Sequence, residues 1–374
     1  MTAATAPPDG DVLAFVESPV QLLNVLEWAH RSGHGNPAVP GDERAGVLPE
    51  PSPSGLTVVV LAPHDPMTRG QLRRMAQLAR DEGHHVEWAQ ARGGALAPLR
   101  TIATLAGPLR RARRLAIGDP FSRYVQLLLT LARPTAELTV VDDGTATMEF
   151  VGQLARGERL VRWHRKGARG PRALLFAPVA AMARRRLRPG EGREVEVFSA
   201  MPVQAPARVR TTVNEFAWTR ARFGPPTVAR GTDMVGTSLV ETGVVDEERY
   251  LEAVRSLARA HGATRYFAHR RESTAKLHRV ATEAGLEVVR PDLPLELVAR
   301  RGPIGRTILS FPSTVVHTLP LALTGTGVRV AVCDVDPAWL TARASPRASG
   351  FLAAVTGTAS GAQRLPSGPA AAAS

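Results

Sequence analysis

The sequence predicts an α/β protein of two domains, each built around a parallel sheet with helices on its faces. Short apolar runs, typical of buried parallel strands, alternate with segments whose apolar residues recur at helical spacing. This alternation stops across 202–226, which is rich in proline and arginine, and then starts again. At 374 residues, 44% of them hydrophobic, the chain is long enough for two cores of ordinary size. We therefore expect one domain over 11–205 and another over 206–343, with their sheets facing a cleft.

The first domain opens with an apolar strand over 12–16, and the helix after it has clear start signals. Ser18 is the expected N-cap and Pro19 the expected first helical residue. The other elements expected in this domain are strands at 56–62, 85–89, 138–141 and 195–198, and helices at 68–82, 96–117, 122–133 and 172–188.

The second domain repeats the alternation. Asp246 is the expected N-cap of a helix that ends at His261. The expected strands end at 236, 268, 290, 310 and 332, and the expected helices cover 245–261, 273–284, 293–300 and 315–323. Segments 1–10, 34–55 and 345–374 are rich in Pro, Gly, Ala, Ser or charge, and we expect them to be flexible.

The charge balance favours anionic partners. Lys and Arg total 47 against 34 Asp and Glu, a net charge of +13. Much of the excess is arginine, with dense clusters at 110–114 and 184–188. Such clusters are usually solvated helix faces; the functional alternative is a dock for anionic lipid headgroups or a polyanionic acceptor. Nucleic acid is disfavoured, because aromatic residues are only 5% and no nucleic-acid-binding module is recognisable.

Cysteine usage and the N-terminus bear on the compartment. Cys333 is the only cysteine, which excludes an intrachain disulfide and a thiolate metal cluster. The first ten residues lack the basic and apolar regions of a secretory signal, and no apolar run is long enough to span a bilayer. We therefore expect a cytoplasmic protein, peripheral at most to the inner face of the membrane.

The strand over 138–141 ends in two carboxylates and a glycine. Ligands of open α/β sheets bind at the carboxyl ends of strands, so Asp142 or Asp143 is placed to act as a general base beside the turn at Gly144. Taken alone, the same stretch is better explained as a strand followed by an ordinary Asp-Gly turn, which is common. Which of the two carboxylates would act is left open.

Polar residues also follow three predicted strands of the second domain. They are Gly236, Ser238 and Glu241, then His269 and Arg270, then Ser313 and Thr314 at a helix start. Serine and threonine there are most often caps, but the free N–H groups of a helix start also favour phosphate. With a base in the other domain, the set suits group transfer from an activated nucleotide donor. No P-loop is present. Apart from Asp334 and Asp336, which we interpret as a strand-end turn, no Asp-x-Asp pair marks a metal site.

Six stretches, in order, resemble bacterial sialyltransferases of the two-Rossmann (GT-B) kind, especially the polysialyltransferase-like and lipooligosaccharide sialyltransferase group. They are 15–24, 141–145, 235–244, 266–270, 293–297 and 310–314. The resemblance implies an inverting transfer of sialic acid, or a related nonulosonic acid, from a CMP donor to a capsule, polysialic-acid-like or surface glycolipid acceptor. It implies no metal and no other cofactor, and an acidic or lipid-linked glycan as acceptor.

The resemblance also implies roles for individual residues. Asp142-Asp143-Gly144 matches the motif that supplies the base, and Ser313-Thr314 matches the motif that holds the donor phosphate. His269 matches the histidine of a His-Pro motif that binds CMP and protonates its phosphate, although Arg270 replaces the proline. Gly236, Ser238 and Glu241 would lie on the donor side, and Ser18 and Gln21 on the acceptor side. The alternatives are a transferase that uses a different nucleotide sugar, and a non-catalytic module that binds acidic glycan or membrane.

Overall fold

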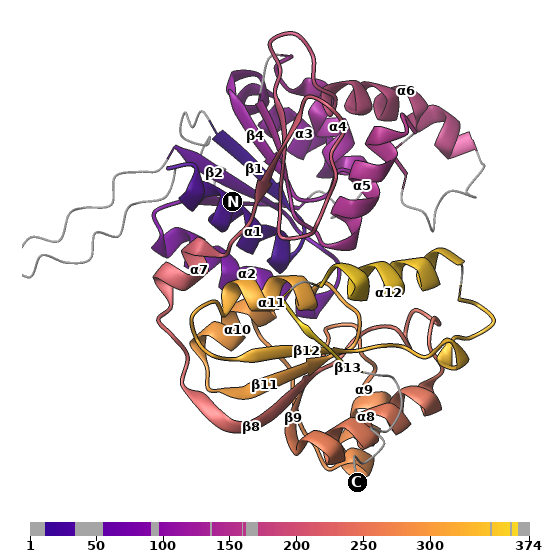
Figure 1. Ribbon diagram of the computed structural model, residues 1–374. Helices are drawn as coiled ribbons and strands as arrows, with labels where there is room; N and C mark the ends of the chain where they lie inside the picture. Colours follow the sequence, from indigo (N-terminus) through magenta and orange to yellow (C-terminus); the bar gives the residue numbers. More distant parts are fainter. Residues whose placement is uncertain are drawn as a thin grey trace, which may run out of the picture. The chain divides into compact units, whose positions relative to one another are not determined.

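The computed structural model describes residues 12–33, 55–90, 97–134, 137–158, 160–161, 171–344, 346–359 and 361–365. It divides the chain into two compact units, unit 1 up to Trp218 and unit 2 from Thr219 (Figure 1). None of the described helices is long and apolar enough to cross a bilayer.

Unit 1 is built on a seven-stranded parallel sheet in the order β3-β2-β1-β4-β5-β6-β7. Its strands are β1 Val12–Val16, β2 Leu56–Leu61, β3 His85–Ala89, β4 Arg114–Ile117, β5 Glu137–Val141, β6 Val195–Ser199 and β7 Val209–Val213. Its helices are α1 Pro19–Arg31, α2 Pro66–Asp81, α3 Ala97–Arg111, α4 Arg123–Leu131, α5 Thr145–Ala155 and α6 Pro171–Arg186, with α7 Ala217–Arg222 crossing the unit boundary.

The helices of unit 1 cover both faces of this sheet. The chain moves from β1 outward to β3 through α1 and α2, then returns across the sheet to β4 through α3. Because such crossovers are right-handed, this reversal puts α3 and α4 on the face opposite α1 and α2. Helix α1 packs beside α2, and α4 packs against both α3 and α6 (Figure 1).

Unit 2 is built on a six-stranded parallel sheet in the order β10-β9-β8-β11-β12-β13. Its strands are β8 Val228–Val235, β9 Ala263–Phe267, β10 Glu287–Val289, β11 Ile304–Ser310, β12 Arg329–Cys333 and β13 Gln363–Leu365. Its helices are α8 Glu247–His261, α9 Thr274–Ala284, α10 Leu295–Arg301, α11 Val315–Ala322 and α12 Pro346–Thr358. The predicted α/β class with two parallel sheets is confirmed, as is Asp246 as the N-cap of α8.

Three sequence-based expectations differ from the structure. The helix expected over 96–117 ends at Arg111, and β4 follows from Arg114. Leu115, Ala116 and Ile117 are fully buried between β1 and β5. Burial on both faces and pairing on both edges stabilise a strand here, although the apolar spacing continues that of the helix.

The expected irregular linker over 202–226 contains β7 and α7. Strand β7 hydrogen-bonds to β6, so the segment from 206 to Trp218 belongs to unit 1. The segment 345–374, expected to be flexible, contains α12 and β13. Strand β13 pairs with β12, and Val355 of α12 is fully buried against Val316 and Val332. Of the other segments expected to be flexible, 1–10 and 34–55 lie outside the described residues, except for Gly55.

Candidate active site

Asp142 lies directly after β5 and is buried, with 2% of its surface exposed. Its Oδ1 accepts a hydrogen bond from the Gly144 N–H at 2.8 Å, and its Oδ2 accepts one from the Ala200 N–H at 3.1 Å. Burial raises the pKa of Asp142, and a hydrogen bond from the Ser199 side chain is the largest of the effects that oppose this rise. Both carboxylate oxygens therefore hold the chain segments that follow β5 and β6.

Asp143 occupies a different environment. It is half-buried, and its backbone N–H donates to Thr147 Oγ1 at 2.9 Å. Gly144 follows with φ 65° and ψ −119°, a conformation that favours glycine. The turn leads directly into α5 and leaves Asp143 as the more accessible of the two carboxylates.

Two buried amide side chains fix the backbone of Asp142. Asn24 Nδ2 on α1 donates to the Asp142 carbonyl at 2.9 Å, and Asn214 Nδ2 donates to Asn24 Oδ1 at 2.8 Å. Asn214 Oδ1 in turn accepts from the Phe216 N–H at 3.0 Å, in a turn where Phe216 has φ 54°. These contacts join α1, the end of β5 and the segment after β7 into one hydrogen-bonded unit.

Ser18 and Gln21 are explained by the local structure of the β1–α1 turn. Ser18 Oγ accepts from the Gln21 N–H at 3.2 Å, which confirms Ser18 as the N-cap of α1. Gln21 Oε1 accepts from the Glu17 N–H at 2.7 Å, and its side chain occupies the space that a Cβ at Gly118 would need. Both residues are buried, and their role on the acceptor side stays a prediction.

In unit 2, the sheet order places the predicted donor residues on neighbouring strands. Strand β8 lies between β9 and β11, and all three run parallel. The loops that follow them therefore leave the same edge of the sheet. These loops carry, in chain order, Gly236, Ser238, Glu241, His269, Arg270, Ser313 and Thr314.

His269 is held as a neutral imidazole in a defined orientation. Its Nδ1 accepts a hydrogen bond from the Arg271 N–H at 3.2 Å, so the proton of the neutral ring lies on Nε2. Burial, followed by the charges of Arg270, Arg271 and Lys276, lowers the pKa of His269 to about 4. At neutral pH the ring therefore presents an Nε2–H donor.

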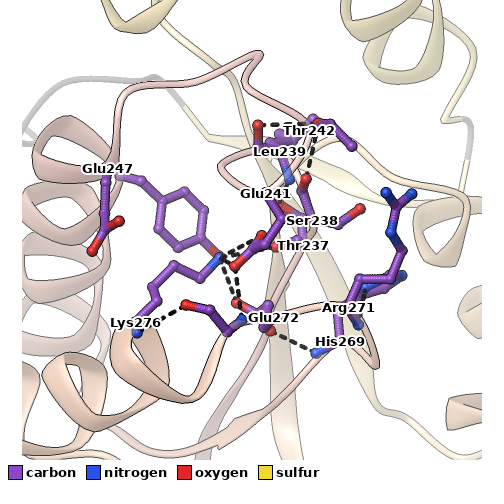
Figure 2. Close-up of polar contacts among 12 residues, drawn as sticks. Thr237, Ser238, Leu239, Glu241, Thr242, Glu247, His269, Arg271, Glu272 and Lys276 are labelled. Atoms are coloured by element: carbon purple, nitrogen blue, oxygen red, sulfur yellow. Dashed lines mark hydrogen bonds and ion pairs between the residues drawn. The ribbon is translucent and has the colours of Figure 1, made fainter. Parts of the chain in front are cut away.

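A buried polar cluster lies beside this histidine (Figure 2). Glu272 Oε2 accepts from the His269 N–H at 2.6 Å, and Glu272 Oε1 lies 2.8 Å from Lys276 Nζ. Lys276 is fully buried, donates to the Thr237 carbonyl at 3.2 Å and to Glu241 Oε2 at 3.1 Å, and lies 4.6 Å from the centre of the Tyr250 ring. This one ammonium thus joins the loops after β8 and β9 to helix α9.

Two tyrosines complete the cluster. Tyr266 Oη donates to Glu272 Oε1 at 2.6 Å and lies 2.7 Å from Tyr250 Oη. Burial raises the pKa of both phenols, so they act as neutral hydrogen-bonding groups. Burial also raises the pKa of Glu272, opposed chiefly by Lys276. A Cβ at Gly236 would collide with Glu272 and Tyr266, which explains the glycine at this position.

Of the remaining predicted donor residues, Glu241 is fixed and the others are more accessible. Glu241 accepts from the Ser273 N–H at 3.1 Å as well as from Lys276, so it supports α9. Ser238 is half-buried, and Arg270 is exposed beside His269. The structure thus separates Glu241, which stabilises the loops, from two residues that are open to a ligand.

Ser313 and Thr314 stand at the start of α11 and are half-buried. Among the described residues, Thr314 does not cap the helix through its side chain. Ser313 Oγ lies 3.4 Å from Ser310 Oγ, a long contact that leaves the hydroxyl able to donate elsewhere. The start of α11 therefore offers hydroxyl and backbone donors together, as an anion site requires.

Several residues of this site were missed by sequence reasoning. Asn24, Asn214, Glu272 and Lys276 hold the candidate residues in place. Asn24 ends the stretch 15–24 but was given no role there, and the other three lie outside the six stretches. One signal was present for Lys276: it shares a helical stripe with Leu277 and Val280, both buried. A lysine in an apolar stripe indicates a buried partner.

The comparisons with known proteins concern the fold. No family model and no curated protein matches the chain. The solved α/β-galactoside α-2,3-sialyltransferase of the luminous marine bacterium Photobacterium phosphoreum is similar with a TM-score of 0.50 at 8% identity, over 94% of this chain and 98% of that one. The chain thus has a GT-B fold.

Two further solved structures are similar at lower scores. The sialyltransferase of Photobacterium damsela has a TM-score of 0.41 at 10% identity, over 95% of this chain and 81% of that one. The heptosyltransferase WaaC of E. coli has a TM-score of 0.40 at 14% identity, over 87% of this chain and 90% of that one.

Proposed function

We propose that the protein is an inverting glycosyltransferase that transfers sialic acid, or a related nonulosonic acid, from a CMP donor to a glycan acceptor. The observation that carries the proposal is the set of candidate phosphate-binding groups that follow β9 and β11, the two strands that flank β8 in the sheet of unit 2. His269 offers an Nε2–H donor, and the start of α11 offers the hydroxyls of Ser313 and Thr314. The fold it shares with a solved sialyltransferase supports the same reaction.

Asp143 is our candidate for the general base. Both carboxylate oxygens of Asp142 accept backbone hydrogen bonds, so a proton taken up there would break contacts that hold the loop. Asp143 is the more accessible neighbour, on a loop that Asp142 and Gly144 fix. A base needs reach to the acceptor hydroxyl, and Asp143 suits this requirement better.

The proposed reaction is a single displacement. The acceptor hydroxyl oxygen attacks the anomeric carbon of the donor sugar while Asp143 takes the hydroxyl proton. The bond from the anomeric carbon to the phosphate oxygen breaks, and its electron pair stays on the phosphate of CMP. His269 Nε2–H, Ser313, Thr314 and the start of α11 stabilise that charge without a metal ion.

The finer assignments belong to the same proposal. Ser238 and Arg270 lie on the donor side, and Arg270 adds positive charge beside His269. We expect an acidic or lipid-linked glycan, such as a capsule polymer, polysialic-acid-like chain or surface glycolipid, as acceptor. The reaction would take place in the cytoplasm, where CMP-activated sugars would be the donor pool.

Calorimetric titration of the protein with CMP, UDP and ADP tests the donor class. We expect CMP to bind more tightly than the other two, and His269→Gln and Ser313→Ala/Thr314→Val to weaken CMP alone. A preference for UDP or ADP would point to a different nucleotide sugar. The absence of affinity for any nucleotide would contradict the enzyme and favour a module that binds acidic glycan. Release of CMP from CMP-sialic acid with candidate acceptors then tests the transfer itself.

A further inference from the structure

A cluster of arginines lies at the edge of unit 1 where its strands begin. Two residues separate the end of α3 from the start of β4, Arg133 lies in the α4–β5 connection, and α6 ends at Arg186 ahead of β6. We call the six arginines of these segments the basic edge: Arg110, Arg111, Arg113, Arg133, Arg185 and Arg186. All of them are exposed except Arg186, which is half-buried.

One backbone hydrogen bond and two from the Arg193 side chain bring the three segments side by side. The Arg133 N–H donates to the Leu109 carbonyl at the end of α3 at 3.4 Å. Arg193, just before β6, donates to the Pro134 carbonyl at 3.4 Å and to the Arg185 carbonyl at 2.7 Å. The basic edge is therefore one surface, although its members are up to 76 positions apart in the sequence (110 to 186).

Helix capping accounts for part of the arginine content here. The Arg193 side chain donates to two carbonyl groups at the end of α6 and to that of Pro134, and Arg114 pairs with Glu137 at 2.7 Å. Neither arginine therefore belongs to the basic edge. Glu191 and Glu194 are the exposed acids of the same α6–β6 connection. Six arginines against these two acids leave a strong positive excess.

The basic edge is separate from the candidate active site. Asp142 and Asp143 follow β5 at its carboxyl end, whereas Arg133 precedes β5. A strand of five residues spans about 17 Å, so the basic edge and the acidic loop lie at opposite ends of the strands of the same sheet. Binding of an acceptor or donor at the acidic loop does not explain this charge.

We propose that the basic edge docks the protein on an anionic lipid bilayer. Clusters of four to eight basic residues at a surface are typical of binding to anionic headgroups. The side chain of Met182 on α6, 47% exposed, lies one turn before Arg185 and Arg186 and adds an apolar contact to the charged surface. Nucleic acid is the less favoured partner, because the basic edge has no aromatic residue that could stack on bases. This inference does not depend on the proposed reaction.

Vesicle co-sedimentation of the full chain tests the docking. We expect binding to vesicles that contain phosphatidylglycerol, little binding to pure phosphatidylcholine, and loss of binding between about 0.05 and 0.5 M salt. The variant R110Q/R111Q/R133Q/R185Q should bind phosphatidylglycerol vesicles at least about tenfold more weakly. The matched lysine variant, which keeps all four charges, should bind like the wild type.

The control variant R73Q/R74Q/R249Q/R259Q removes four exposed arginines from α2 and α8, so its net charge falls equally. It should retain vesicle binding. An equal loss of vesicle binding in both variants would overturn the proposal. So would a wild-type protein that does not bind vesicles containing phosphatidylglycerol. Tighter binding of duplex DNA through the same four arginines would also overturn it. Thermal unfolding of every variant shows whether a loss of binding reflects a loss of fold.

Discussion

Asp142 and Asp143 are adjacent carboxylates after β5, and a shift of one residue along the chain gives their side chains different roles. Asp142 is buried and accepts hydrogen bonds from two backbone N–H groups. Asp143 is half-buried and lies next to a turn that glycine makes possible. The sequence presents them as equivalent, and only their surroundings distinguish the residue that shapes the loop from the candidate base.

Single substitutions should therefore have opposite signatures. Asp143→Asn is expected to lower the transfer rate about 10²–10⁴-fold with little effect on the free energy of unfolding, because it removes a base from an accessible position. Asp142→Asn is expected to lower the free energy of unfolding by about 1–3 kcal/mol, because an amide cannot accept both backbone hydrogen bonds. Rate assays and urea unfolding of both variants measure the two effects. Normal activity in Asp143→Asn would contradict its role as base.

The ionisation of His269 gives a second prediction. Burial and three nearby cations lower its pKa to about 4, so folding favours the neutral ring. The stabilisation this gives is complete above about pH 6.5 and is lost as the pH falls towards 4. Nuclear magnetic resonance of the imidazole should show titration near pH 4 in the free protein, and an upward shift when the CMP phosphate binds beside it. A pKa that CMP leaves unchanged would argue against a phosphate contact.

At the scale of elements, helix α9 supports the candidate donor site through its first turn. Lys276 and Glu272 lie four residues apart, and both side chains are fully buried. Between them they contact the loops that follow β8 and β9. The cluster therefore sets the spacing of these two loops, and it does so at the cost of taking two charges out of water.

Removal of one partner of this pair should be severe. Lys276→Met leaves Glu272 as an unpaired buried charge and is expected to lower the free energy of unfolding by about 3–5 kcal/mol. Glu272→Gln keeps the size of the side chain but weakens the pairing, so it should cost less stability while loosening His269. Urea unfolding and CMP titration of the two variants separate these effects. Tight CMP binding in a folded Glu272→Gln protein would show that the cluster does not position the histidine.

The last elements of the chain should contribute to stability. Val355 and Leu352 of α12 are buried, and β13 extends the sheet beside β12. A chain that ends at Ala344 would expose Val316 and Val332 and lose these contacts. We expect its free energy of unfolding to fall by at least about 3 kcal/mol, since each buried aliphatic side chain contributes about 1.5–3 kcal/mol. An unchanged thermal midpoint would contradict this packing.

At the scale of the whole molecule, each unit has its own sheet and its own apolar core. All the candidate phosphate-binding residues belong to unit 2, whereas Asp142 and Asp143 belong to unit 1. The proposed reaction thus needs both units, but nucleotide binding needs only the second.

This division leads to a prediction for the isolated second unit. A protein of residues 219–374 should fold and bind CMP within about tenfold of the full chain, because it retains its core and the three loops. It should show no transfer activity. Circular dichroism, CMP titration and a transfer assay measure these properties. A folded second unit without affinity for CMP would contradict the assignment of the donor site.

The sequence alone determined the fold class and most elements. Strands such as β1 and β2 are mostly apolar and buried, and helices such as α1 and α8 carry the caps expected of them. These features depend on local chemistry and periodicity, which can be read directly. The alternation of strands and helices predicted two parallel sheets. The candidate residues were identified because they follow predicted strands.

Tertiary structure decided the rest, because burial and pairing act between segments far apart in the chain. Residues 114–117 form a strand because they pair with β1 and β5, and β7 pairs with β6. The segment around Val355 is helical and packs against Val316 and Val332. The tertiary structure also buries Asp142 against two backbone N–H donors and buries Lys276 close enough to His269 to affect its pKa. Neighbours in the sequence cannot reveal such environments, since the partners are supplied by other strands and helices. The sequence therefore named the chemical groups of the candidate site, and the fold determined which of them hold it together.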